Sequence, residues 1–93
     1  MRVIQSRLFE RKVKKLSKHQ KAQLDEAVRK ILNDPSIGEK KKGDLKTVFI
    51  YKFKIDQNLF LLAYEFTSES LNLIMLGPHE NYYRDLKKYL KDK

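Results

Sequence analysis

The chain contains no cysteine and no tryptophan, and only 3 glycines and 2 prolines among its 93 residues. Without cysteine, the sequence excludes disulfide bonds, thiolate chemistry and cysteine ligands for a metal. The two histidines, His19 and His79, lie far apart in the sequence and do not have the spacing of a zinc site. We therefore expect neither a structural metal nor a cofactor.

Acidic residues and long apolar runs are also scarce. There are 12 Asp and Glu against 21 Lys and Arg, which leaves a formal net charge of +9. Such an excess attracts nucleic acids, anionic membranes or an acidic protein partner. No apolar run approaches the roughly 20 residues that span a bilayer, and no secretory signal pattern is present. We expect a cytosolic protein that does not act at a membrane.

The length of the chain indicates one domain, because domains cluster near roughly 100 to 150 residues. Hydrophobic residues make up 41% of the chain, which is enough to form a core. We therefore predict a single domain over residues 1–93.

The first third of the chain has the pattern of a short strand and two helices. Residues 1–5 are predicted to form the strand, and Ser6 is a candidate N-cap for a helix with apolar residues at helical spacing. Ser17 and Gln20 have the spacing of a capping box at the start of a second helix. That helix is predicted to end before Pro35, because the residue preceding a proline is pushed out of the helical region.

Three strand patterns follow. Residues 47–55 alternate, which places Lys52 and Lys54 on the same face of a half-buried strand. Residues 59–66 are apolar on both faces, as in a central strand that is covered on each side. Residues 71–76 form the last strand, and the short turns between the three strands predict an antiparallel meander.

A loop and a final helix complete the predicted fold. Residues 36–46 have no apolar periodicity and are predicted to form an exposed loop. A helix with an apolar side is predicted to begin near Pro78, where a first-turn proline is tolerated. The order is strand, helix, helix, strand, strand, strand, helix, an α+β architecture. An αα-hairpin would cover one face of an antiparallel sheet, and Lys52 and Lys54 would line the open part of the other face.

The candidate catalytic residues are His79, Lys52, Lys54 and Tyr83. Histidine can take or give a proton near neutral pH, and the strand lysines can neutralise a phosphate. If residues 79–83 are helical, His79 and Tyr83 share a face, so the ring of Tyr83 could stack on a base. Proton chemistry beside a phosphate-binding surface predicts RNA cleavage.

These side chains also have structural interpretations, which the sequence leaves open. His79 could cap the last helix or bind a backbone carbonyl, and the two strand lysines could simply face water. The remaining basic candidates would bind RNA phosphates or be solvated surface. They are Lys40, Lys41, Lys42, Lys46 and Arg84.

Three segments of the sequence, together with the predicted order of helices and strands, match the pattern of a known family. They are Asp34-Pro35-Ser36-Ile37-Gly38-Glu39-Lys40 leading to Gly43-Asp44-Leu45-Lys46, then Tyr51-Lys52-Phe53-Lys54, then His79-Glu80-Asn81-Tyr82-Tyr83-Arg84. This set resembles the RelE/ParE superfamily of bacterial and archaeal toxins over nearly the whole chain. The resemblance implies a RelE-like fold and a toxin of a type II toxin–antitoxin pair.

The resemblance also implies roles for the candidate residues. RelE-like members cut mRNA in the ribosomal A site without a metal, whereas ParE-like members poison DNA gyrase. In the RelE-like branch, strand lysines hold phosphates, and a histidine or arginine with an aromatic near the chain end assists the chemistry. Lys52, Lys54, His79 and Tyr83 match these roles. The central strand departs from the pattern, because Phe60-Leu61-Leu62 stands where many RelE-like enzymes carry an arginine.

The leading expectation is a ribosome-dependent mRNA endonuclease that inhibits translation, with the ribosome, mRNA and a cognate antitoxin as partners. One alternative is a ParE-like gyrase inhibitor. Another is a catalytically weak basic nucleic-acid-binding module, which the missing arginine favours. From the charge and the resemblance, we expect an acidic antitoxin segment that lies across the basic cleft or replaces the last helix. The sequence leaves the oligomeric state open.

Overall fold

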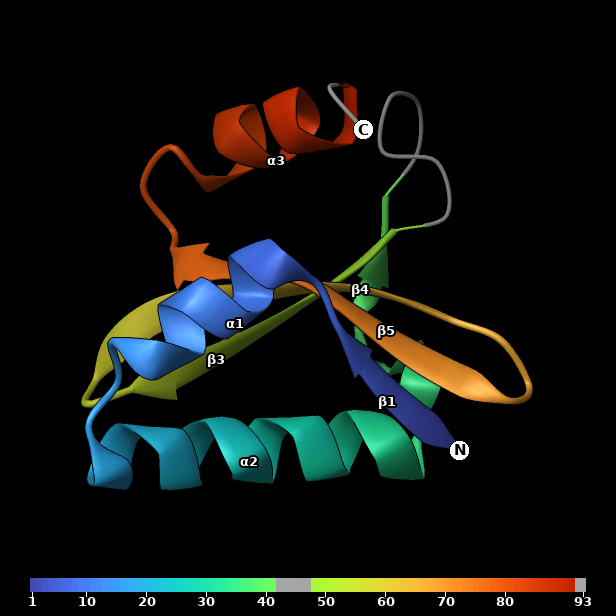
Figure 1. The fold of residues 1–93 in the computed structure, drawn as a ribbon, viewed down its shortest axis with the longest axis horizontal. Helices are drawn as coiled ribbons and strands as arrows, with labels where there is room; N and C mark the ends of the chain where they lie inside the picture. Colours follow the sequence, from blue (N-terminus) through green and yellow to red (C-terminus); the bar gives the residue numbers. More distant parts are fainter. Residues whose placement is uncertain (42–47, 92–93) are drawn as a thin grey trace.

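The computed structural model describes residues 1–41 and 48–91, and these residues form a five-stranded sheet with three α-helices (Figure 1). The strand order is β1-β5-β4-β3-β2. The elements are β1 (Arg2–Gln5), α1 (Arg7–Lys14), α2 (Lys18–Asn33), the 3-10 turn η1 (Pro35–Ile37), β2 (Glu39–Lys40), β3 (Phe49–Ile55), β4 (Asn58–Phe66), β5 (Ser70–Pro78) and α3 (Tyr82–Lys91).

The sheet lies between α2 and α3, which cover opposite faces, while α1 lies beside β1 and β5 (Figure 1). Two hydrophobic clusters fill these spaces. The α2 cluster lies between α2 and the sheet, and its buried residues are Phe9, Leu24, Ile31, Leu62, Tyr64, Leu71, Leu73 and Leu76. The α3 cluster lies between α3 and the sheet, and its buried residues are Val48, Ile50, Leu61, Ala63, Ile74, Met75, Tyr82 and Leu86. The α+β prediction is confirmed, and β4 is covered on both faces as its sequence predicts.

The two predicted helix starts are confirmed by their caps. The Ser6 hydroxyl accepts a hydrogen bond from the Phe9 N–H, which caps α1. Ser17 and Gln20 form a complete capping box at the start of α2. The α2 helix ends at Asn33, as the proline two residues later predicts. Each cap satisfies backbone donors that the first helical turn leaves unpaired.

The predicted meander is antiparallel, but the whole sheet is mixed. Strands β3, β4 and β5 pair antiparallel, whereas β1 pairs parallel with β5 over Ser70 to Leu73. The expectation of a fully antiparallel sheet is therefore wrong for β1. The long connection between β1 and β5 permits parallel pairing, and Ser6 fixes it, because the Ser6 N–H donates to the Leu73 carbonyl. The Ser6 hydroxyl donates to the carbonyl of Ile74, at a bulge in β5.

The turn between β3 and β4 consists of Asp56 and Gln57, which have positive φ angles of 50° and 69°. Two successive left-handed residues are typical of a type I′ turn, whose twist matches a two-residue hairpin. Two glutamines of α2 hold this turn: Gln20 and Gln23 each donate to the Asp56 carboxylate, and the Asp56 N–H donates to the Gln23 side chain. The helix and the hairpin are thereby fixed to each other at the end of the sheet.

Two predicted boundaries are wrong. Within the predicted loop, η1 and the short strand β2 form, and β2 pairs with β3 through Glu39–Lys40. A buried tyrosine holds this segment: the Tyr64 hydroxyl donates to the Pro35 carbonyl and accepts from the Gly38 N–H. The last helix begins at Tyr82 and not near Pro78, because Pro78 is the final residue of β5. There, the Pro78 nitrogen faces away from β4, so its missing N–H removes no ladder bond.

Candidate functional site

The strand lysines lie on the face of the sheet that α3 covers. Lys52 and Lys54 alternate with Tyr51 and Phe53, whose rings pack toward α2, and they follow Ile50, which is buried in the α3 cluster. Both lysines are exposed. The predicted face of β3 is therefore confirmed, and the two ammonium groups are available to a ligand.

His79 lies in the same cross-strand row as Lys54. The His79 N–H donates to the Leu59 carbonyl at 3.2 Å, which extends the β4–β5 ladder one residue beyond β5. Leu59 in turn pairs with Lys54 on β3. Paired residues of neighbouring strands are about 5 Å apart, so the backbones of Lys54 and His79 are separated by about 10 Å. The register places both residues on the α3 face, which is the arrangement that a shared site needs.

The premise that His79 and Tyr83 lie one helical turn apart is wrong. Residues 79–81 form a turn, in which the His79 carbonyl accepts the Tyr82 N–H and Asn81 has a φ of 59°. Asparagine is one of the few non-glycine residues that adopts this left-handed conformation readily. The His79 side chain is exposed, and its position is set by the strand register and not by a helix.

Leu59 lies between Lys54 and His79 in this cross-strand row. It is one of the exposed large hydrophobic residues, at 39% of its maximal area. An apolar side chain flanked by a lysine and a histidine offers a surface for a base or sugar, with charge on one side and a proton-transfer group on the other. The sequence does not single out Leu59, because alternation alone does not show which β4 residue stands opposite Lys54.

Lys41 connects β2 to α3 on the same face. Its ammonium donates to the Glu39 carboxylate at 3.0 Å and lies 5.1 Å from the centre of the Tyr83 ring. The hydrogen bond from Lys41, with its charge, lowers the pKa of Glu39, and Lys52 contributes to this shift. The bond to Glu39 likewise raises the pKa of Lys41, with a further contribution from Tyr83. Tyr83 is thus held by a cation, which keeps its ring at the edge of the strand-lysine face.

Tyr82 has a structural role. Its ring is 1% exposed, and its hydroxyl donates to the Met75 carbonyl at 2.6 Å. Burial raises the pKa of Tyr82 far above the usual value, so the hydroxyl stays protonated. The ring also packs over Gly77, where a β-carbon would lie 3.4 Å from it. Tyr82 therefore belongs to the core, and it anchors the first turn of α3 to β5.

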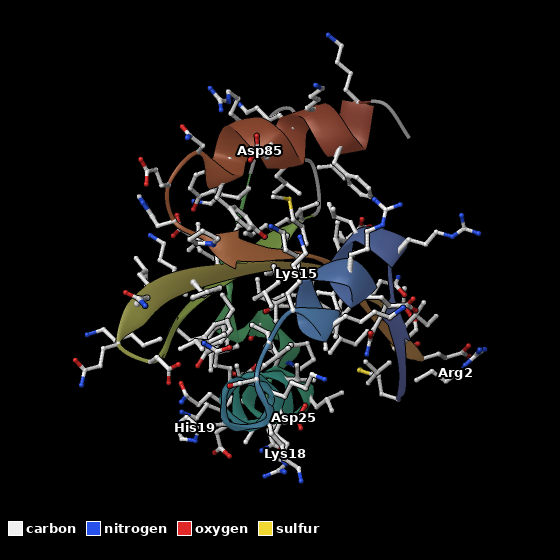
Figure 2. All side chains as sticks on the ribbon, turned by 60° about the vertical axis from the view of Figure 1, so that its left-hand side comes forward. Arg2, Lys15, Lys18, His19, Asp25 and Asp85 are labelled. Carbon is white, nitrogen blue, oxygen red and sulfur yellow. The ribbon has the colours of Figure 1, made fainter. Side chains whose placement is uncertain are left out.

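The other basic candidates are dispersed. Lys40 is the last residue of β2, and it pairs with Phe49, whose ring belongs to the opposite face. Arg84 lies 3.8 Å from Asp85, and both side chains are largely exposed; Figure 2 shows Asp85 on the side of α3 away from the sheet. Lys42 and Lys46 lie outside the described residues.

The central strand carries no cation on the α3 face between the lysines and β5. The residue opposite Lys52 is Leu61, which is 0% exposed and belongs to the α3 cluster. An arginine at this position would lose its water, which is costly without a partner. In the described part of the chain, no group of three or more His, Asp or Glu side chains is arranged to hold a metal ion.

A separate groove lies on the other face, between α2 and β3. Tyr51 and Phe53 form its strand side, and Lys54 reaches it from the end of β3. The α2 side includes His19, whose imidazole lies 3.7 Å from the Asp56 carboxylate. The groove shares Lys54 with the candidate site, but it lies on the face away from Leu59 and His79.

Comparisons with known proteins decide the family. The sequence model of the ParE-like toxins of type II bacterial toxin–antitoxin systems matches residues 3–87. The chain belongs to this family. It is a toxin of the RelE/ParE type, in a fold with three α-helices and a five-stranded sheet. No curated protein matches the sequence significantly.

Three solved structures from E. coli have the same fold. A mutant of the RelE toxin in the free state is 16% identical with a TM-score of 0.73, and the match covers 97% of this chain and 95% of that one. The intact RelBE toxin–antitoxin complex gives 21% identity and a TM-score of 0.63, over 85% and 96% of the chains. The isolated RelE toxin in a second crystal form gives 22% and 0.62, over 95% and 97%. The RelE-like fold is therefore confirmed.

Among the described residues, no helix is both long and apolar enough to cross a membrane.

Proposed function

We propose that this toxin is a metal-independent endoribonuclease that cleaves mRNA on the ribosome and thereby inhibits translation in the cytoplasm. Residues 1–93 act as one toxin domain, and the cross-strand row of Lys54, Leu59 and His79 is its centre. The observation that carries the proposal is the register of β3, β4 and β5, which supports a lysine and an exposed histidine on one face, about 10 Å apart.

The chemistry requires a base, an acid and positive charge at the phosphate. The 2′-oxygen attacks the phosphorus and loses its proton to a base, while the bond to the 5′-oxygen breaks and an acid protonates the leaving oxygen. His79 serves as one of these two proton-transfer groups. Lys52 and Lys54 stabilise the charge that develops on the phosphate oxygens. Tyr83 stacks on a neighbouring base, in a position that Lys41 supports.

The outer basic residues hold the flanking RNA backbone. Lys40, Lys41, Lys42, Lys46 and Arg84 are assigned this role. Each contact with a phosphate releases counterions, so their contribution falls as the salt concentration rises. Because Lys41 is already paired with Glu39, it contributes mainly by orienting Tyr83.

A cognate antitoxin with an acidic segment controls this site. The E. coli RelBE structure is that of a toxin–antitoxin complex of the same fold, which supports such a partner. The exposed lysines of the α3 face provide the complementary charge. An acidic segment that lies across them, or that takes the place of α3 on the sheet, excludes RNA from the row.

The second candidate function is inhibition of DNA gyrase. Two observations favour it: the matching family is described as ParE-like, and the buried Leu61 leaves the central strand without a cation. In that case the α3 face binds a protein, and His79 has no proton to transfer. The same observation of Leu61 supports the third alternative, a basic RNA-binding module with weak activity.

The two histidines allow a matched test of cleavage. We expect His79→Gln to reduce mRNA cutting by purified toxin on programmed ribosomes at least about 100-fold, because general acid–base groups contribute roughly 10²- to 10⁴-fold. His19→Gln removes an equivalent side chain at the start of α2, on the other face of the sheet from His79, and should leave the rate unchanged. Both variants should bind ribosomes as the unmodified toxin does.

Induced expression separates the two targets. Mapping of mRNA 5′ ends should show new ends in translated codons for the unmodified toxin and for His19→Gln, but not for His79→Gln. DNA breaks without new mRNA ends, at equal levels in all three proteins, would reject the proposal in favour of gyrase. Full cutting by His79→Gln would remove the histidine from the mechanism.

A further inference from the structure

The positive charge of the chain is concentrated in the hairpin of α1 and α2, away from the proposed site. Residues 7–21 include seven Lys or Arg and one Glu, so that this segment carries six of the nine net positive charges. None of the seven forms an ion pair with a carboxylate in residues 1–41 and 48–91. The charge of the segment is therefore not neutralised within the described structure.

One side of α1 gathers three of these charges. Arg7, Arg11 and Lys14 recur at the i, i+4 and i+7 spacing of a single helical face, and all three are exposed. The opposite face is fixed to the protein, because Phe9 packs into the α2 cluster and Leu8 against the α3 cluster. The three residues, here called the α1 basic face, are thus presented on a rigid support.

The turn after α1 and the start of α2 carry further positive charges. Figure 2 shows Lys15 at the end of α1 and Lys18 at the start of α2. The N-terminal end of a helix carries a partial positive charge, which acidic residues usually offset. The first turn of α2 contains no acidic residue, and Lys18 and Lys21 lie near this end instead. Lysine near a helix N-terminus is unfavourable, because its charge lies at the positive end of the helix dipole. Its presence there is hard to account for by the stability of the helix.

The α1 basic face is separate from the strand lysines. The α1 helix lies beside β1 and β5 (Figure 1), whereas Lys52 and Lys54 are on β3. Strands β4 and β5 lie between them. A ligand that occupies one surface leaves the other accessible.

The composition of the α1 basic face indicates the kind of ligand. Proteins that bind single strands add exposed aromatic rings to their cations, because the rings stack on unpaired bases. Residues 7–21 contain one aromatic residue, Phe9, which is 1% exposed. Double-helical RNA keeps its bases stacked and presents mainly phosphates and 2′-hydroxyls, for which cations suffice. The strand site differs, because Tyr83 is available there.

We propose that the α1 basic face binds the phosphate backbone of double-helical RNA and anchors the toxin on folded RNA while the strand site acts on a single strand. The proposal deepens the proposed function, which supplies the RNA, but it makes its own prediction about binding. Each phosphate contact adds about 0.9 to the slope of log affinity against log salt concentration. The three side chains should account for two to three units of that slope.

The test measures binding of a 20-base-pair RNA duplex over a range of salt concentrations. All proteins carry His79→Gln, so that cleavage cannot affect the measurement. The test variant adds Arg7→Gln, Arg11→Gln and Lys14→Gln. The matched control adds Lys87→Gln, Lys88→Gln and Lys91→Gln, which removes the same charge from exposed positions of α3. Thermal unfolding verifies that both variants are folded.

The expected result is a slope smaller by about two to three units and an affinity at least about tenfold lower at 0.1 M salt for the α1 variant. The control should change by less than about one unit. Equal changes in both variants would show that only net charge matters and would overturn the proposal. Tighter binding of a DNA duplex of the same sequence than of the RNA duplex would also overturn it. The two proposals can fail separately. If the α1 variant loses duplex binding but the unmodified toxin does not cut mRNA, the α1 basic face is still an RNA-binding surface and only the proposed function is rejected.

Discussion

Helix α2 covers its face of the sheet with 16 residues, of which Leu24, Ala27 and Ile31 are buried, whereas α3 covers the other face with 10 residues, of which Tyr82 and Leu86 are buried. A capping box starts α2, and two of its glutamines hold the β3–β4 turn. The first turn of α3 is anchored by one tyrosine. The α2 face is thus covered by the longer helix, apart from the groove between α2 and β3, while the α3 face leaves room for exposed lysines.

This difference indicates a division of work between the two faces. A face that a longer helix covers buries apolar area over more of its length, and this burial stabilises the fold. A partly covered face can keep charged groups in water and close to a ligand, and elements with few buried contacts also open at lower free energy. If RNA and an antitoxin compete for this site, as we propose, a helix that is released more easily would allow one to replace the other.

The largest expected effect is in the core beneath each helix. Ile31 and Leu86 are both 0% exposed. We expect Ile31→Ala to lower the free energy of unfolding by about 2–5 kcal/mol, because it leaves a cavity that the long helix cannot close. Leu86→Ala should cost less, since undocking of α3 limits the loss. Denaturant unfolding measures both values, and hydrogen exchange should show faster exchange confined to α3 for Leu86→Ala. Equal losses with uniform exchange would contradict the difference between the faces.

The two buried tyrosines provide a finer comparison. Tyr64 and Tyr82 each donate to a backbone carbonyl at 2.6 Å, one on each side of the sheet. Replacement by phenylalanine leaves that carbonyl unpaired, which costs about 1–3 kcal/mol at either position, and Tyr64→Phe also leaves the Gly38 N–H without its partner. The effects on activity should differ, because Tyr82→Phe loosens the helix that carries Tyr83, while Tyr64→Phe loosens η1 beside the α2 face. Unfolding free energy and mRNA cutting, measured on both variants, test this. Equal loss of activity would mean that the α3 anchor does not position the site.

Local chemistry explains which parts of the fold could be predicted from the sequence. The caps at Ser6 and Ser17 depend on side chains within three residues of each other, and the lysine face of β3 depends on simple alternation. Strand β2 could not be predicted in this way, because two residues become a strand only by pairing with β3. The parallel pairing of β1 depends on a distant contact, from Ser6 to Leu73 and Ile74.

The sequence indicates which residue types could form the candidate site, but not their geometry. Lys52, Lys54 and His79 were found by residue type, and their placement on one face depends on the register of two ladders. That register is set by two turns and a bulge, which the sequence does not specify uniquely. The same segment misled the prediction of the last helix, since a proline can begin a helix or end a strand with an unpaired nitrogen. The pairing of Lys41 with Tyr83 required the fold to bring β2 and α3 together.

The smallest expected effect concerns the turn that α2 holds. The hydrogen bonds from Gln20 and then Gln23, with the nearby His19, lower the pKa of Asp56 below its ordinary value. A lowered pKa means that the folded state favours the carboxylate, so this contribution to stability is present above about pH 4 and is lost as the pH falls through the folded pKa.

Asp56→Asn keeps a side chain suited to the positive φ at this position but does not titrate. The difference in unfolding free energy between the two proteins should therefore be constant above about pH 5 and shrink toward pH 2. Because Asp56 is exposed, salt should reduce the difference further. A difference that stays constant down to pH 2 would mean that the carboxylate charge does not contribute to holding α2 on the hairpin, and that packing alone closes this face.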